Sequence, residues 1–348
     1  MDRPEPRDKL EASAQVVTTV QELDSDYSLK MHSIFHLCLE PLIGILDRHF
    51  DYFGMGRRGI APITYYLELT SNGIPLALGR AVELAITVEL FRAKRPNRDA
   101  AKPPEERLLL DQNITLQAFR RSGSALELGF DDGSGEPVTA GTFRLIQIFT
   151  RPMAPPGARS LREAPPEFSG LRERSFPGPL MTPEELWQVP EGFETLEQAP
   201  APGDPHVWGR GNTDINHHVT VTEYLRALEN EFVQRLHRTG EQVGNHRLER
   251  LRCIFRKPSF AGDVFRLDGA AYRRGEETRF LGGVFKEQKP AVFKEQNPAV
   301  FKEQNPSVSK EQKLGMSKEQ ESGAFENSPA VTGCLEGRIA PHDDGNPG

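Results

Sequence analysis

The feature that most constrains the fold is an order of segments that occurs twice in this 348-residue chain. In each half, apolar residues first recur at helical spacing and then alternate with polar residues as they do in strands. Pro41 lies within the first helical set, so we expect it to kink or divide that helix. The helical positions of the first half are Ile34, Cys38, Leu42, Ile45 and Leu46, and the strand-like segments are 81–91, 107–119, 125–130 and 142–149.

The second half follows the same plan. Gly240 lies where the terminator of its helix is expected. The helical positions are Val221, Tyr224, Leu225, Leu228, Phe232 and Leu236, and the strand-like segments are 249–255, 263–272 and 278–286. We therefore predict an α+β fold in which each half is one long helix wrapped by a curved antiparallel sheet, with the two units side by side.

The segment between the halves is rich in proline. Prolines between 151 and 200 lie too close together for a helix or a central strand, which predicts a linker or a wrapping connection. Within it, Thr182, Pro183 and Glu185 have the spacing of an N-cap, a first helical residue and a capping partner, so one short helix is expected. The predicted division is a first unit at 15–150, a linker at 151–200 and a second unit at 201–287.

A repeat with a period of eight residues follows the second unit. The tripeptide KEQ begins at 286, 294, 302, 310 and 318, in units such as VFKEQNPA. A solenoid element takes about 20 to 50 residues, and the prolines of the early copies stop helix growth. We therefore predict that 288–348 is a disordered tail. A docking tail that carries a short motif is the alternative.

Composition limits the partners. The net charge is −7 without a long basic run, which argues against nucleic-acid binding. The N-terminal segment is charged, and no apolar stretch reaches the roughly 20 residues that span a bilayer, so neither export nor a membrane location is expected. Three widely spaced cysteines without a CxxC pair suit reduced thiols in the cytoplasm. No phosphate-cradling glycine loop and no metal-ligand spacing occurs, so no cofactor is predicted.

The candidate site is the segment that leads into the second helix. Asp214, Asn216 and His218 occupy alternate positions, so an extended lead-in would place their side chains on one side. Hydrolysis of an acyl compound needs one group to polarise the carbonyl, one to direct or supply the attacking oxygen, and one to handle the proton. Here Asp214 can be base or nucleophile, Asn216 an orienting donor and His218 the proton donor, beside the N–H groups of a helix N-terminus.

Helix capping is the competing interpretation of this segment. Thr213, Asp214 and Asn216 are of residue types that favour the N-cap position. Capping would account for one of these side chains but leaves His218 without a role. His217 has the opposite parity and is expected to point outward or to act indirectly.

The pattern Asp214, Asn216, His218, Val219 and then Tyr224 resembles the DxNxHV…Y segment of hot-dog-fold thioesterases. It is most similar to acyl-acyl-carrier-protein thioesterases, which carry two hot-dog units in one chain. The resemblance implies hydrolysis of a fatty or polyketide-type acyl thioester, carried by acyl carrier protein or coenzyme A, to the free acid. The predicted catalytic residues are Asp214, Asn216 and His218, and the predicted substrate contacts are Tyr224, Glu229 and Ser259.

The sequence also departs from that family. Plant-type members place a Glu or Cys on the strand after the helix, and Ser259 and Phe260 stand at those places here. In the first half, Asp24 and Asp26 precede His32 without an intervening Asn. The first unit is therefore expected to be a degenerate partner that lines the acyl tunnel, with residues 50–69 closing the tunnel mouth.

Two other functions remain open from the sequence. A catalytically silent acyl-binding or scaffold protein would fit the substituted strand positions and the repeat. A hot-dog hydratase or dehydratase typically has a His five residues after the Asp, whereas Asp214 and His218 are four apart. Two fused units supply the pairing that single hot-dog chains obtain by dimerising, so both a monomer and a homodimer are compatible with the sequence.

Overall fold

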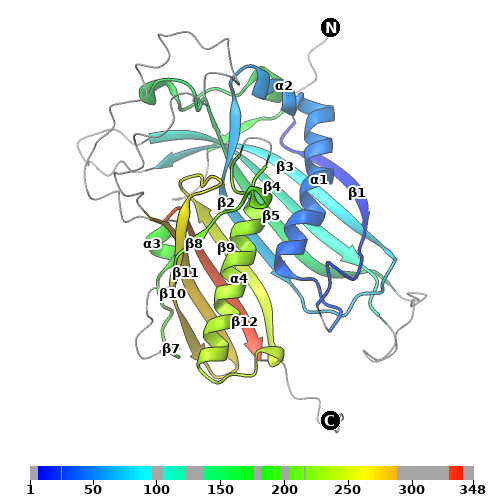
Figure 1. Cartoon of the computed structure of the whole chain (residues 1–348). Coiled ribbons are helices and arrows are strands. Elements are labelled where there is room, and N and C mark those ends of the chain that lie inside the picture. The colour runs from blue at the N-terminus through cyan, green and yellow to red at the C-terminus, as the bar shows by residue number, and fades with distance from the viewer. Residues whose placement is uncertain are drawn as a thin grey trace.

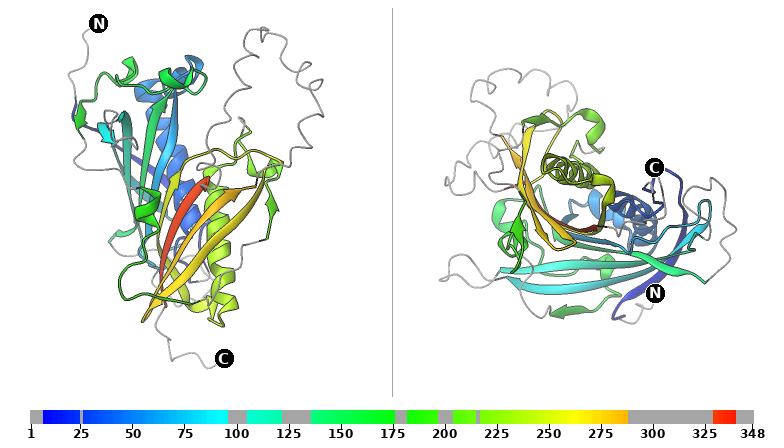
Figure 2. Two further views of the ribbon diagram at one scale, coloured as in Figure 1. Left: turned by 90° about the vertical axis from the view of Figure 1, so that its left-hand side faces the viewer. Right: turned by 90° about the horizontal axis from the view of Figure 1, so that it is seen from below.

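The computed structural model describes residues 7–24, 26–95, 105–121, 136–175, 182–196, 204–214, 217–287 and 329–339. Its strands form one largely antiparallel sheet of 12 strands, and two long helices pack on the inner face of that sheet (Figures 1 and 2). No described helix is long and apolar enough to cross a membrane.

The elements follow the order expected from the sequence. The first unit contains β1 (Leu10–Val17), α1 (Met31–Phe50), α2 (Tyr52–Arg57), β2 (Ala61–Ser71), β3 (Ala81–Arg95), β4 (Glu105–Ala118) and β5 (Val138–Thr150). The connection contains β6 (Glu173–Ser175), α3 (Pro183–Leu186) and β7 (Glu194–Thr195). The second unit contains β8 (His206–Val207), α4 (Val221–Arg238), β9 (His246–Phe255), β10 (Val264–Arg274), β11 (Glu277–Lys286) and β12 (Val331–Ile339).

The two halves of the sheet have the same topology. The strand order is β1-β3-β4-β5-β2 in the first unit and β9-β12-β11-β10-β7 in the second. Read outward from the junction, β2, β5, β4 and β3 correspond to β9, β12, β11 and β10. The predicted plan of a helix and a curved sheet in each half is therefore present. The expected strand at 125–130 lies outside the described residues.

The strand β2 joins the two units. It pairs with β9 from Tyr66 opposite Ile254 to Thr70 opposite Arg250. Sequence reasoning placed 50–69 as a segment that closes a tunnel mouth, and this is wrong for the residues of β2. Their apolar run directly follows a Gly-rich stretch, which concealed its strand character.

Ion pairs on the outer face of the sheet cross this junction. Glu68 of β2 accepts from Arg250 Nε of β9 at 2.7 Å, and the Glu68 carboxylate also accepts from the hydroxyl of Tyr66 at 2.8 Å. Arg252 of β9 reaches Glu336 of β12 at 2.6 Å. Because Glu68 belongs to the first unit and Arg250 to the second, their contact reinforces one register across the junction, whereas the pair of Arg252 with Glu336 lies within the second unit.

The predicted disordered tail at 288–348 requires a correction. Val331–Ile339 forms β12, which pairs with β9 on one side and β11 on the other. Val331 and Leu335 are fully buried against the inner core. Without β12, the strands β9 and β11 would have no common neighbour. Residues 288–328 and 340–348 lie outside the described residues.

The sequence of β12 explains why it was overlooked. Its pairing partners lie far away in the sequence, beyond the repeats, and its segment VTGCLEGRI contains two glycines. Gly333 is required by packing, because a Cβ at this position would lie 2.7 Å from Leu228 Cδ1 of α4. The helix therefore crosses the strand where no side chain separates them.

The helical faces expected from the sequence form the inner core. The predicted apolar residues of α1, and those of α4 from Tyr224 to Leu236, are buried, while Val221 at the start of α4 is half-buried. Pro41 lies inside α1 and does not divide it, since the helix is continuous from Met31 to Phe50. Burial of such faces against the sheet is the main source of stability for both helices.

The proline-rich connection packs against both units. Phe168 is fully buried and stacks on Phe50 with ring centroids 4.4 Å apart. Thr182 and Glu185 form the predicted capping box of α3, which confirms the short helix. Trp187 then donates from Nε1 to the carbonyl of Gly282 on β11 at 3.3 Å. The connection is thus a wrapping segment rather than a detached linker.

Two deletions test the role of β12. We expect truncation after Glu287 to abolish cooperative folding of the second unit, because β9 and β11 each lose a strand partner. Replacing 288–328 by a short Gly/Ser linker should preserve the fold and keep Tm within about 4 °C, because Val284 and Val331 are paired and the Ala330 N–H donates to the Val284 carbonyl at 2.7 Å. Thermal unfolding followed by circular dichroism distinguishes the two outcomes. A cooperative transition of the second unit in the truncated chain would contradict this role.

Candidate active site

A short closed loop precedes α4. Thr213 and Val219 form an antiparallel bridge at its base. Inside it, the N–H of Asp214 donates to the carbonyl of His218 at 2.9 Å. His217 has a φ of 62°, in the left-handed region that few side chains adopt. The backbone therefore reverses within five residues, and the expected extended lead-in is instead a tight turn.

The helix begins after this loop. Its first residue is Val221 and its N-cap is Thr220, whose side chain makes no capping hydrogen bond. The capping interpretation is therefore wrong for Thr213 and Asp214, which lie before the cap. The loop residues are nevertheless beside the N-terminus of α4, as the catalytic interpretation requires.

The structure brings Asp214 and His218 together. Asp214 Oδ1 accepts the backbone N–H of His218 at 3.1 Å, so the carboxylate helps to hold the turn. Both residues are exposed, and the His218 ring packs edge-on against Phe260 with centroids 5.0 Å apart. His217 is exposed as expected. Asn216 lies outside the described residues, so its place in the site stays a prediction.

The segment after β9 that contains Ser259 packs against the loop before α4. The N–H of Val219 donates to the carbonyl of Ser259 at 2.8 Å, and the N–H of Ser259 donates to the hydroxyl of Tyr224 at 2.8 Å. Ser259 is fully buried, and Tyr224 is almost so. Burial raises the pKa of Tyr224 above its usual value, so this hydroxyl stays protonated at neutral pH. Two residues predicted as substrate contacts therefore contact each other.

Aromatic rings fix Tyr224 in place. Trp208 meets the Tyr224 ring edge-on with centroids 5.4 Å apart, and Trp208 itself stacks on Phe265 of β10 at 3.8 Å. Offset and edge-on aromatic contacts of this kind are favourable beyond the area that they bury. Tyr224 thereby connects α4 to the segment that carries Ser259.

Sequence reasoning missed Lys286 as part of this site. Lys286 Nζ donates to the carbonyl of Pro258 at 2.8 Å, forms an ion pair with Asp263 at 2.8 Å, and lies 5.3 Å from the ring centroid of Phe260. It was overlooked because it begins the first KEQ copy. Its position at the end of an alternating strand segment was the available signal.

Glu229 lies elsewhere. It is eight residues beyond the start of α4, a rise of about 12 Å along a helix. Its Oε1 accepts the backbone N–H of His32 at 2.9 Å, and its Oε2 lies 2.6 Å from His32 Nδ1. The structure thus joins Glu229 to the N-terminus of α1 and does not bring it to the loop that carries Asp214.

The described residues contain no group of three or more His, Cys, Asp or Glu side chains arranged to hold a metal ion. Cys38, Cys253 and Cys334 are buried free thiols. Burial raises the pKa of each thiol, which keeps it protonated and unreactive.

Comparisons with known proteins reveal similarity in structure. No protein-family model and no curated protein matches the sequence. An acyl-ACP thioesterase from Bacteroides thetaiotaomicron superposes with a TM-score of 0.50 at 12% identity, over 94% of this chain and 97% of that one. The 12:0-ACP thioesterase from Umbellularia californica superposes with a TM-score of 0.53 at 12% identity, over 94% of this chain and 97% of that one. A proposed oleoyl thioesterase from Lactobacillus plantarum superposes with a TM-score of 0.54 at 10% identity, over 95% of this chain and 96% of that one.

These similarities extend over nearly the whole chain, so the double hot-dog fold expected from the DxNxHV resemblance is present here. At such low identities the likeness establishes the fold alone.

The support that Tyr224 gives to the site can be measured. In Tyr224→Phe, the buried N–H of Ser259 loses its acceptor, and we expect the free energy of unfolding to fall by about 1–3 kcal/mol. Urea unfolding measures the change. Tyr272→Phe is the matched control, because the Tyr272 hydroxyl makes no hydrogen bond to another described residue, and it should change stability by less than about 0.5 kcal/mol. Equal effects of the two substitutions would contradict the assigned role.

Proposed function

We propose that the protein is a thioesterase that hydrolyses an acyl thioester to the free acid. One observation carries the proposal: Asp214 and His218 are held together in a tight exposed loop beside the N-terminus of α4, in the double hot-dog fold. The exposed position of both side chains would let a bulky carrier-bound thioester approach them. The proposed substrate carries a fatty or polyketide-type acyl group, which is bound as a thioester to acyl carrier protein or coenzyme A.

The proposed reaction assigns one role to each loop residue. Asp214 takes a proton from water while the water oxygen bonds to the acyl carbon. The carbon–sulfur bond then breaks, and His218 gives a proton to the departing thiolate. Asn216 orients the thioester by donating a hydrogen bond, and backbone N–H groups at the start of α4 stabilise charge on the carbonyl oxygen. The proton taken by Asp214 returns to His218 through solvent.

Supporting residues shape the site in this proposal. Tyr224 and Ser259, which were predicted as substrate contacts, form the buried wall behind the loop and hold it in position for the substrate. Lys286 sits beside Phe260 and, through its contacts with Pro258 and Asp263, holds the segment that carries Ser259 next to the loop. We further propose a cytoplasmic location, since all three cysteines are free thiols.

Thiol release from a panel of acyl thioesters tests the proposal. We expect the wild type to release thiol, and Asp214→Ala and His218→Ala to lower the rate about 10²–10⁴-fold, because each removes a proton-transfer group. His217→Ala is the matched control. It alters a neighbouring exposed imidazole and should leave the rate within about threefold of the wild type.

Two outcomes would reject it. Absence of thiol release for every chain length and both carriers would favour a silent acyl-binding protein. Equal losses in His217→Ala and His218→Ala would mean that the loop conformation matters, but not the imidazole of His218.

A further inference from the structure

The described residues of the loop before α1 form the same backbone hydrogen bonds as those of the loop before α4. The N–H of Asp24 donates to the carbonyl of Ser28 at 2.8 Å, and the N–H of Tyr27 donates to the carbonyl of Asp24 at 2.9 Å. Tyr27 has a φ of 64°. Leu23 and Leu29 form the antiparallel bridge at the base. Each of these features has a counterpart in the loop before α4. The left-handed residue of that loop is His217, with a φ of 62°.

The shared hydrogen bonds align the two loops residue by residue. The first unit therefore carries a D-x-D-x-S version of the D-x-N-x-H motif, which was hidden in the sequence because neither the amide nor the imidazole is retained. The matched positions are Asp24 with Asp214, Asp26 with Asn216, and Ser28 with His218.

The changed side chains remove the groups needed for hydrolysis. Ser28 replaces the imidazole, and its hydroxyl and N–H both donate to Asp26 Oδ1, at 2.6 and 2.9 Å. The other Asp26 oxygen accepts from Arg247 Nε of β9 at 2.9 Å. The middle side chain of the motif is thus tied to its own loop and to the second unit, and it cannot donate a hydrogen bond to a carbonyl.

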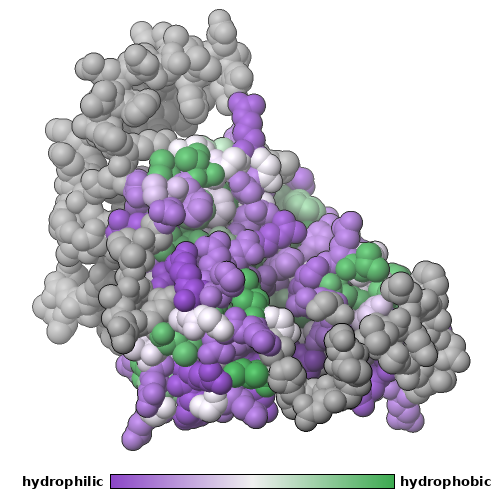
Figure 3. All heavy atoms as spheres, turned by 60° about the horizontal axis from the view of Figure 1, so that its bottom comes forward, coloured by the Kyte–Doolittle hydropathy of each residue, from purple (hydrophilic) through white to green (hydrophobic). Residues whose placement is uncertain are grey.

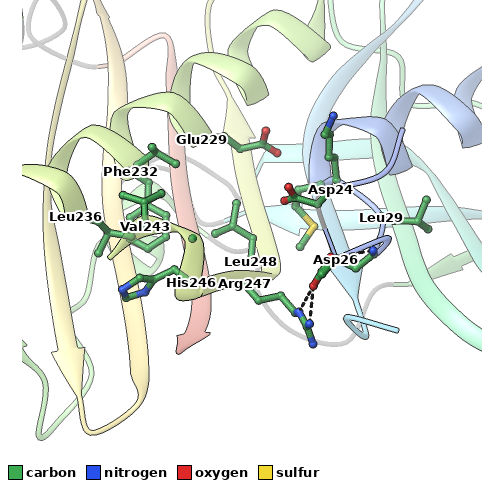
Figure 4. A pocket seen from close by; sticks show the side chains of 15 residues that line it. Asp24, Asp26, Leu29, Glu229, Phe232, Leu236, Val243, His246, Arg247 and Leu248 are labelled. Atoms are coloured by element: carbon green, nitrogen blue, oxygen red, sulfur yellow. Dashed lines mark hydrogen bonds and ion pairs between the residues drawn. The ribbon is translucent and has the colours of Figure 1, made fainter. Parts of the chain in front are cut away.

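A cavity of about 340 Å³ lies beside this first loop, between α1, α4 and the start of β9. This volume is in the range of small-molecule sites. Figure 4 shows Asp24 and Glu229 on opposite sides of it and apolar side chains along the α4 and β9 wall. The apolar lining comes from Met31, Phe232, Leu236, Val243 and Leu248.

The cavity wall is held by contacts between the units. Glu229 of α4 accepts the His32 N–H at 2.9 Å and also contacts its ring nitrogen. Two acids of the lining have partners across the units, since Asp26 pairs with Arg247 and Glu229 contacts the His32 ring. The molecular face in Figure 3 is mainly hydrophilic, with separate small apolar patches.

We propose that this cavity is a second acyl-binding site that holds an uncharged acyl thioester group without hydrolysing it. Its apolar wall suits an alkyl chain, and its mixed polar rim suits a neutral head group with amide hydrogen bonds. A carboxylate head is disfavoured, because the rim carries three acids, Asp24, Asp26 and Glu229, against two cations, Lys30 and Arg247. The identity of the ligand, though not the existence of the site, rests on the proposed function.

Calorimetric titration with a hydrolysis-resistant probe tests the second site. The probe is dodecanoyl-N-acetylcysteamine with an NH in place of the thioester sulfur. We expect two binding events per wild-type chain and one in Gly244→Phe. Gly244 lines the cavity, and a Cβ built on it has no atom within 4 Å, so the substitution places a bulky ring at the cavity wall without a clash at the Cβ.

Gly157→Phe is the matched control. Gly157 is likewise exposed and has open space around a built Cβ, but it lies away from the cavity, so both binding events should persist. Thioester hydrolysis by Gly244→Phe should stay within about twofold of the wild-type rate, because the variant leaves the loop at 214–218 unchanged. Dodecanoate should bind at least about tenfold more weakly than the amide probe at the site that Gly244→Phe blocks.

The outcomes separate this inference from the proposed function. The second site is overturned if the wild type shows no binding event that Gly244→Phe removes, even if hydrolysis is observed. Loss of one event in Gly244→Phe supports the second site even in a chain that hydrolyses nothing. Dodecanoate binding as tight as that of the amide would overturn the preference for a neutral head group.

Discussion

The pairing of β2 with β9 is the interaction on which the rest of the structure depends. Five residue pairs continue the hydrogen-bonded ladder from one unit into the other, so the two sheets become one. Because the strands are antiparallel, the helices α1 and α4 lie on the same face, and the loop before α1 lies against the opposite unit. Ion pairs such as that of Glu68 with Arg250 outside, and the contact of Glu229 with His32 inside, hold that arrangement on both faces.

In this arrangement the two loops share a turn but differ in the chemistry of their side chains. Both loops keep the same turn, with a left-handed residue in fourth place, because each must end at the start of a long helix that is packed on the sheet. The side chains then set what each loop can do. Asp214 and His218 are exposed, whereas Asp26 and Ser28 bond to each other. This difference supports the proposal that the cavity beside the first loop binds a ligand without hydrolysing it.

The proximity of Asp214 to His218 was predictable because it is local. A tight turn, and not the expected extended segment, brings the Asp214 carboxylate to the backbone N–H of His218, and the catalytic roles of these residues stay a prediction. The contact between Tyr224 and Ser259 was not predictable, since 35 residues separate them and β9 must first fold against α4. The capping interpretation was wrong because several residues that favour the N-cap position lie close together before α4. Their preferences alone do not show at which of them the helix begins.

The sequence by itself determined the elements whose signal is local: two amphipathic helices, most of the strands, the capped α3 and the loop motif before α4. The tertiary structure decided which strands are neighbours. Only in the folded sheet do β2 and β9 meet, and only there does β12 return past the repeats to lie between β9 and β11. Hydrophobic periodicity reports which face of a segment is buried, whereas strand pairing depends on hydrogen-bond partners far apart in the chain, which no local pattern encodes.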